Sequence, residues 1–137
     1  MKITINRSFY NKKEQLKEFP AETLEAVARN MSVDAPQLSK YFVDTGAFIT
    51  SWQITDGRRG RPRGRSSRGL TRRKGDQTFS KAMAAESTRQ MQSDIAKIDF
   101  RNTTRLVLRN GAPHARYVDA KHSKVMDQLR NKYGRYS

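Results

Sequence analysis

The chain has 137 residues, a net charge of +15 and a pI of about 10.7, and 35% of its residues are hydrophobic. The length fits one domain, and the basic excess implies an acidic partner such as nucleic acid, an anionic membrane or an acidic protein surface. The lack of cysteine excludes disulfides and thiolate metal sites. Because no apolar run reaches the ~18 residues of a membrane span, we expect a soluble protein made in a reducing cytoplasm.

The N-terminal third predicts a strand and a long helix. Ile3 and Ile5 alternate with polar neighbours, as in a short strand. A helix is expected to start at Phe19–Glu22, with a proline in its first turn, and to end near Asp34–Pro36, because the residue before a proline avoids the helical region. Its buried face carries four residues at helical spacing: Leu24, Val27, Ala28 and Met31.

A capped turn and a second strand follow. Asp44 or Thr45 can cap a short helical turn that carries Phe48. Trp52 and Ile54 then alternate with polar residues, which indicates a strand. We expect Trp52 to be buried between the first helix and the sheet.

Residues 57–75 differ from the rest of the chain in composition. Nine of these 19 residues are basic, five are glycine and none is acidic. Only Leu70 is apolar, so burial cannot offset the entropy of ordering, and we expect an extended, mobile loop inside one domain. Arginine and glycine alternate without aromatic residues, which favours phosphate contact independent of base sequence; an acidic protein surface and bare solvent are the alternatives. The candidate contacting residues are Arg58, Arg59, Arg61, Arg63, Arg65, Arg68, Arg72, Arg73 and Lys74.

The C-terminal half predicts two helices and more strand. Residues 78–96 have helical periodicity, Ile98 and Phe100 alternate, and residues 104–108 are rich in strand-forming side chains. The last stretch, Ser123 to Tyr133, predicts a helix whose apolar face consists of Val125, Met126, Leu129 and Tyr133.

The order of elements predicts an α+β fold in a single domain of residues 1–137. We expect a small, mostly antiparallel sheet packed with the long helix of the N-terminal half. A second helix follows the long basic loop, and a third lies at the C-terminus.

Catalytic and metal sites are poorly supported. His114, Asp119 and His122 are metal-ligating residue types, but no further carboxylate or cysteine nearby completes a ligand set. Phosphate-binding glycine loops and nucleophile elbows are also missing from the sequence. We therefore expect no enzyme activity, no metal and no cofactor.

Two stretches resemble motifs of the neck and tail-completion proteins, which join head to tail in tailed bacteriophages. Val43 to Trp52 is similar to that family's Val-Asp-Thr-Gly-x-Leu-x-x-Ser-Trp motif. Arg109 to Asp119 is similar to its later motif, a strand that ends in Asn-x-Ala-Pro-Tyr-Ala-x-Tyr-Val-Glu. The resemblance covers roughly residues 20–120.

The resemblance implies a structural virion protein of the phage neck, assembled in the host cytoplasm, that joins the DNA-filled head to the tail. Such subunits form six-fold or twelve-fold rings around the DNA channel. A head-completion adaptor or portal ring lies on one side, a tail terminator or tail tube on the other, and packaged DNA is a further possible partner. The motif residues would then be architectural: Asp44, Thr45, Gly46, Trp52, Asn110, Pro113 and Tyr117. Asp44 would cap the short helical turn, and Trp52 would pack beneath Pro113 and Tyr117.

Two other functions remain open from the sequence. One is a sequence-independent nucleic-acid-binding protein of another kind, which would be a monomer or dimer that binds DNA at modest salt. The other is a small nuclease that uses His114 or His122 and requires a metal.

Overall fold

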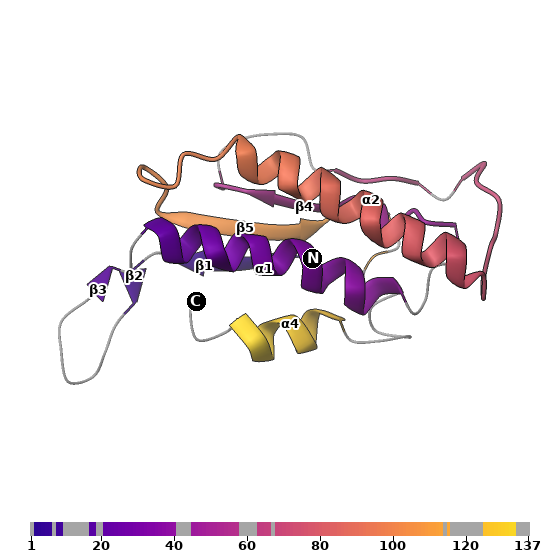
Figure 1. Ribbon diagram of the computed structural model, residues 1–137, viewed down its shortest axis with the longest axis horizontal. Coiled ribbons are helices and arrows are strands. Elements are labelled where there is room, and N and C mark those ends of the chain that lie inside the picture. The colour runs from indigo at the N-terminus through magenta and orange to yellow at the C-terminus, as the bar shows by residue number, and fades with distance from the viewer. Residues whose placement is uncertain are drawn as a thin grey trace.

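The described residues form an α+β fold, as the order of predicted elements indicates (Figure 1). The computed structural model describes residues 2–6, 8–9, 17–18, 21–40, 45–57, 63–66, 68–113, 115 and 125–133. The strands are β1 (Lys2–Asn6), β2 (Ser8–Phe9), β3 (Lys17–Glu18), β4 (Trp52–Thr55) and β5 (Arg105–Asn110). The helices are α1 (Ala21–Ser39), the short 3-10 turn η2 (Ile49–Ser51), α2 (Gln77–Ala96) and α4 (Val125–Tyr133).

The main sheet is antiparallel, with strand order β1-β5-β4. Leu108 of the central strand β5 is in register with Ile3 of β1 and with Ile54 of β4. Apart from Val107, the apolar side chains of these strands point to one face, which α1 and α2 cover, while α4 packs beside α1 (Figure 1). The predicted strand around Ile3 and Ile5 is therefore confirmed as β1. A separate pair, β2 and β3, lies outside this sheet.

The core confirms the helical faces that the periodicity predicts. In α1 the predicted residues Leu24, Val27, Ala28 and Met31 are all buried. In α4 the same is true of Val125, Met126, Leu129 and Tyr133. None of the helices among the described residues is long and apolar enough to cross a membrane.

The alternation at Ile98 and Phe100 does not form a strand. The amides of Lys97 and Ile98 donate to carbonyls three residues back, which tightens the end of α2 into a turn. A further turn closes between the amide of Asn102 and the carbonyl of Asp99. Phe100 is buried as part of the core, so its apolar character reflects packing rather than a strand.

Helix α1 runs through Pro36 to Ser39, so the prediction that it ends near Asp34–Pro36 is wrong. Proline has no amide hydrogen, and the carbonyl of Ser32, one turn earlier, loses its usual helical partner. The hydroxyl of Thr88 on α2 donates to this carbonyl at 2.8 Å. A tertiary hydrogen bond thus replaces the missing helical one and lets the helix continue.

This replacement predicts a measurable cost for Thr88→Val. The variant keeps the side-chain shape but leaves the carbonyl of Ser32 unpaired, so the free energy of unfolding should fall by about 1–3 kcal/mol in urea denaturation. Thr78→Val, at an exposed position of the same helix, is the control and should change little. In a Pro36→Ala background, which restores an amide donor, the Thr88 effect should shrink; an undiminished effect there would refute the explanation.

Candidate functional site

Trp52 is the last residue of the first motif stretch and is fully buried, as predicted. Its indole Nε1–H donates to Ser39 Oγ on α1 at 2.9 Å, and Ser39 Oγ donates to the carbonyl of Ala35 at 2.7 Å. The ring of Phe48 meets the indole edge-on, with centroids 5.7 Å apart. Trp52 therefore ties the start of β4 to the last turn of α1.

The second motif stretch lies directly against the first. Asn110, at the end of β5, pairs in register with Trp52, and its Nδ2 donates to the carbonyl of Phe48 at 2.8 Å. The amide of Gly111 also donates to the carbonyl of Ser51 at 3.4 Å. Stretches about sixty residues apart in the chain thus form one hydrogen-bonded junction.

Other motif residues are placed differently from the expectation. Pro113 is exposed, and the contacts we identify for the Trp52 indole are with Phe48 and Ser39. Asp44 and Tyr117 lie outside the described residues, so their expected roles as cap and cover stay predictions.

Thr45 and Gly46 form the turn that leads into η2. Thr45 Oγ1 accepts from the amide of Ala47 at 3.3 Å, as a turn cap does. Gly46 has a φ of +85°, and a Cβ there would lie 3.2 Å from the sulfur of Met83 and 3.3 Å from the ring of Phe79. Glycine is therefore required both by the backbone and by the close approach of α2.

Arg63 is bonded into the fold through its guanidinium group. Its guanidinium donates to both carboxylate oxygens of Asp94 on α2, at 2.6 and 3.0 Å, and to the carbonyl of Trp52 at 2.6 Å. Asp94 also accepts from the amide of Ile54 at 3.2 Å. We call this arrangement of Arg63 and Asp94 at the edge of β4 the edge clasp.

The edge clasp satisfies backbone groups that β4 would otherwise leave open. β4 is the last strand of the sheet, so one side of it has no strand partner. The carbonyl of Trp52 and the amide of Ile54 point to that side, and Arg63 and Asp94 bond to them. Covering an open edge in this way prevents pairing with a foreign strand.

Residues 63–65 lie against the sheet end. The amide of Arg63 donates to Gln53 Oε1 at 3.2 Å, and the amide of Arg65 donates to Ser51 Oγ at 2.8 Å. A Cβ on Gly64 would come within 2.2 Å of the Gly111 carbonyl oxygen. A mobile loop throughout 57–75 is therefore not confirmed: its described part has no helix or strand but is bonded to the fold at Arg63–Arg65.

The other described cations of the segment are exposed: Arg65, Arg68, Arg72, Arg73 and Lys74. Arg73 lies over the ring of Phe79, 5.0 Å from its centroid, and its guanidinium is 3.5 Å from the carboxylate of Asp76. Asp76 in turn caps α2 by accepting from the amide of Phe79. Arg58, Arg59 and Arg61 lie outside the described residues.

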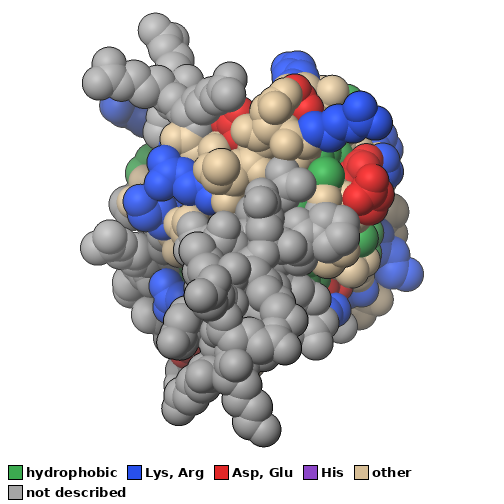
Figure 2. All heavy atoms as spheres, turned by 90° about the vertical axis from the view of Figure 1, so that its left-hand side faces the viewer, with side chains coloured by type: hydrophobic (Ala, Val, Ile, Leu, Met, Phe, Trp, Pro, Cys, Tyr) green, Lys and Arg blue, Asp and Glu red, His purple; other side chains and the backbone are tan. Residues whose placement is uncertain are grey.

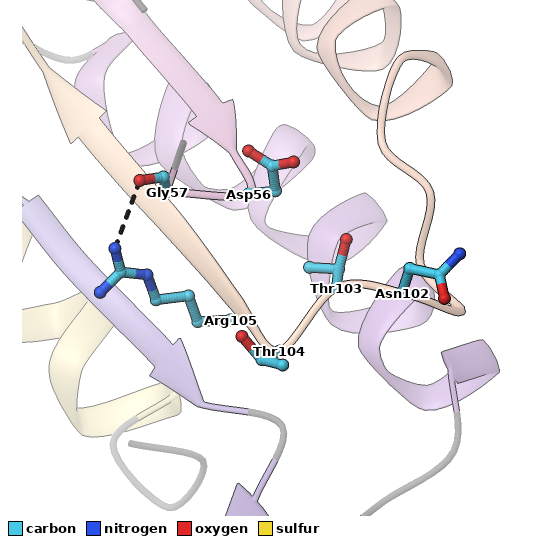
Figure 3. Close-up of a pocket in the computed structure, with 6 residues that line it drawn as sticks. All are labelled: Asp56, Gly57, Asn102, Thr103, Thr104 and Arg105. Atoms are coloured by element: carbon cyan, nitrogen blue, oxygen red, sulfur yellow. Dashed lines mark hydrogen bonds between the residues drawn. The ribbon is translucent and has the colours of Figure 1, made fainter. Parts of the chain in front are cut away.

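A polar hollow of about 320 Å³ lies where β4 ends and β5 begins (Figure 3). It is lined by Asp56, Gly57, Asn102, Thr103, Thr104 and Arg105. Arg105 donates to the carbonyl of Gly57 at 3.3 Å across it. Beside it, the Asn102 side chain holds the pKa of Asp99 below its usual value. Among the described residues that line the hollow, Asp56 is the single carboxylate.

The metal hypothesis is not supported by the part of the chain that the structure describes. No group of three or more His, Asp or Glu side chains there could hold a metal ion. His114, Asp119 and His122 all lie outside the described residues, so their own arrangement stays untested.

Sequence reasoning missed two exposed cations on α2, Lys81 and Arg89, and a third, Lys97, directly after its end. At 3.6 residues per turn, the spacing of eight residues turns each cation about 80° from the one before it, so no same-face periodicity marks them in the sequence. Asp94 as the partner of Arg63 had no signal either, because the two residues are 31 positions apart.

Replacing Trp52 should separate packing from hydrogen bonding. Trp52→Ala should lower the free energy of unfolding by about 3–5 kcal/mol, because it leaves a large cavity. Trp52→Phe keeps most of the packing but loses the bond to Ser39, and should cost about 1–2 kcal/mol. Chemical denaturation measures both, and a Trp52→Ala protein as stable as the parent would contradict this role.

Breaking the edge clasp should cost more than breaking an exposed ion pair. Asp94→Asn leaves the Arg63 guanidinium without its carboxylate and should lower stability by about 2–3 kcal/mol. Glu25→Gln, which breaks the exposed pair of Glu25 with Arg29 on α1, is the matched control and should cost about 0.5 kcal/mol or less. If both variants lost the same free energy of unfolding in urea denaturation, the edge clasp would contribute no more to stability than an exposed ion pair.

Comparison of the chain with protein-family models, with curated proteins and with solved structures finds no match.

Proposed function

We propose that this chain is a structural subunit of a bacteriophage neck, a head–tail connector or tail-completion protein that works as a ring around the DNA channel. It would join the DNA-filled head to the tail and would perform no catalysis. A portal or adaptor ring would contact it on one side, and a tail terminator or tail tube on the other.

The observation that supports this proposal most is the junction of the two motif stretches. Trp52 and Asn110 are register partners, and Asn110 is hydrogen bonded to Phe48. Residues that carry the resemblance therefore serve the architecture of the fold, as expected for a family whose motif residues are structural. The buried Trp52 is also remote from solvent, where it could not act on a substrate.

A second candidate function is sequence-independent nucleic-acid binding outside a virion. It is favoured by the exposed cations that follow the edge clasp, Arg65 to Lys74. The two candidates differ in assembly, because the connector must become a ring on its partners whereas the other protein would act as a monomer or dimer.

The decisive experiment is a nonsense mutation in the gene for this chain, followed by electron microscopy of the particles. We expect filled heads and complete tails that accumulate separately or leak DNA, because their connecting ring is missing. Native mass measurement should give a monomer or small oligomer for the free chain, since rings would crowd its like charges.

Complementation supplies the control for this experiment. The parent chain should restore joining, and imaging of the neck should reveal a six-fold or twelve-fold ring that contains it. Normally joined, infectious particles without the chain would refute the proposal.

A further inference from the structure

We propose that the exposed side of α2 and the preceding basic segment form one surface that binds the phosphates of duplex DNA. We call it the α2 basic surface. Its members are the exposed cations Arg65, Arg68, Arg72, Arg73, Lys74, Lys81, Arg89 and Lys97. The inference rests on the proposed function for its setting, a DNA channel, but it depends on different residues from the motif junction.

The charge of this surface is one-sided. Among the described residues from 63 to 97, eight cations are exposed, whereas the three carboxylates are only partly exposed. Of the three carboxylates in this range, Asp76 caps α2 and Asp94 is held in the edge clasp. The third, Glu86, is only partly exposed. Exposed cations therefore outnumber carboxylates by eight to three in this range, which favours the approach of a polyanion.

The basic segment and the helix are joined at both ends. Arg63 is bonded to Asp94 near the end of α2, and Asp76 caps its first turn. Asp94 and Asp76 are separated by about 27 Å along the helix axis, at 1.5 Å per residue. The segment therefore starts near the C-terminal end of α2 and, in Figure 1, leads to the N-terminal end of the same helix.

On the other two described α-helices, exposed cations lie beside carboxylates. Exposed Arg29 is paired with Glu25 on α1, and Arg130 lies near Asp127 on α4. Figure 2 faces the end of the molecule at which α1 begins and α2 ends, where acidic side chains lie among basic ones. The exposed faces of α1 and α4 are thus more mixed in charge than the α2 side.

Three features of the α2 basic surface favour the backbone of duplex DNA over other polyanions. Its cations are interspersed on α2 with the small exposed residues Ala82, Ala85, Ser93 and Ala96, which allow phosphates to approach closely. Phe79, the aromatic residue of this part of α2, lies under Arg73, so a stacking platform for single-stranded bases is lacking among the described residues. The length of α2, about 30 Å, is close to one turn of duplex DNA, about 34 Å.

The test is a fluorescence anisotropy titration of the full chain with a duplex of about 30 base pairs, between about 50 and 200 mM salt. The helix variant combines Lys81→Gln, Arg89→Gln and Lys97→Gln. The matched control removes three cations elsewhere, with Lys2→Gln, Arg29→Gln and Arg130→Gln. All six side chains are exposed, and circular dichroism checks that both variants keep the fold.

We expect the parent chain to bind duplexes of unrelated sequence equally well. In the helix variant the slope of log affinity against log salt should fall by about 2–3, and affinity at 100 mM salt should fall about tenfold or more. The control variant should keep the parent slope and stay within about threefold in affinity, because its cations lie off the surface.

Three results would overturn the inference. The helix variant could match the control, the single strand could bind as tightly as the duplex, or the duplex could fail to bind at about 50 mM salt. The last result would assign the surface to an acidic protein. Electron microscopy of the particles tests the neck function separately. If the chain binds duplex DNA through α2 but heads and tails join without it, only the neck function is refuted.

Discussion

The open edge of β4 imposes the constraint on which the layout of this chain depends. The outward carbonyl of Trp52 and the outward amide of Ile54 need partners, and Arg63 and Asp94 supply them together. Asp94 can do so only if α2 lies beside β4, and Arg63 only if the chain returns to the sheet soon after leaving it. The same pair therefore protects the sheet, positions the second helix and fixes where the basic segment begins.

Polar hydrogen bonds inside an apolar core hold the helical layer together. The bond from Trp52 to Ser39 connects the sheet to α1, and the bond from Thr88 to Ser32 connects α1 to α2. Each one satisfies a buried group that the local backbone leaves open, which is the usual condition for polar atoms in a core. Packing alone would allow α1 and α2 to slide along each other, whereas these bonds define one register.

The sequence predicts those elements whose burial is one-sided, and it fails where a distant residue changes a local rule. The apolar face of α4 and the alternation in β1 follow from periodicity, because one face of each meets the core. Pro36 would end an isolated helix, but Thr88, which is 52 positions later, supplies the missing donor. The composition of the basic segment does not distinguish among its nine cations. Arg63 differs from the others because it forms an ion pair with Asp94, which lies near it only in the folded chain.

The close contact at Gly64 limits which substitutions this position can accept during evolution. Any side chain there would collide with the Gly111 carbonyl, while a Cβ at Gly69 or Gly75 would meet no atom within 4 Å. Insertions and deletions should accumulate after Ser66, in exposed chain where length is not set by packing. A single missense codon at position 64, by contrast, would push the segment off the sheet. Descendants of this sequence should therefore differ most in the length of the segment after Ser66 and least at Arg63, Gly64 and Arg65.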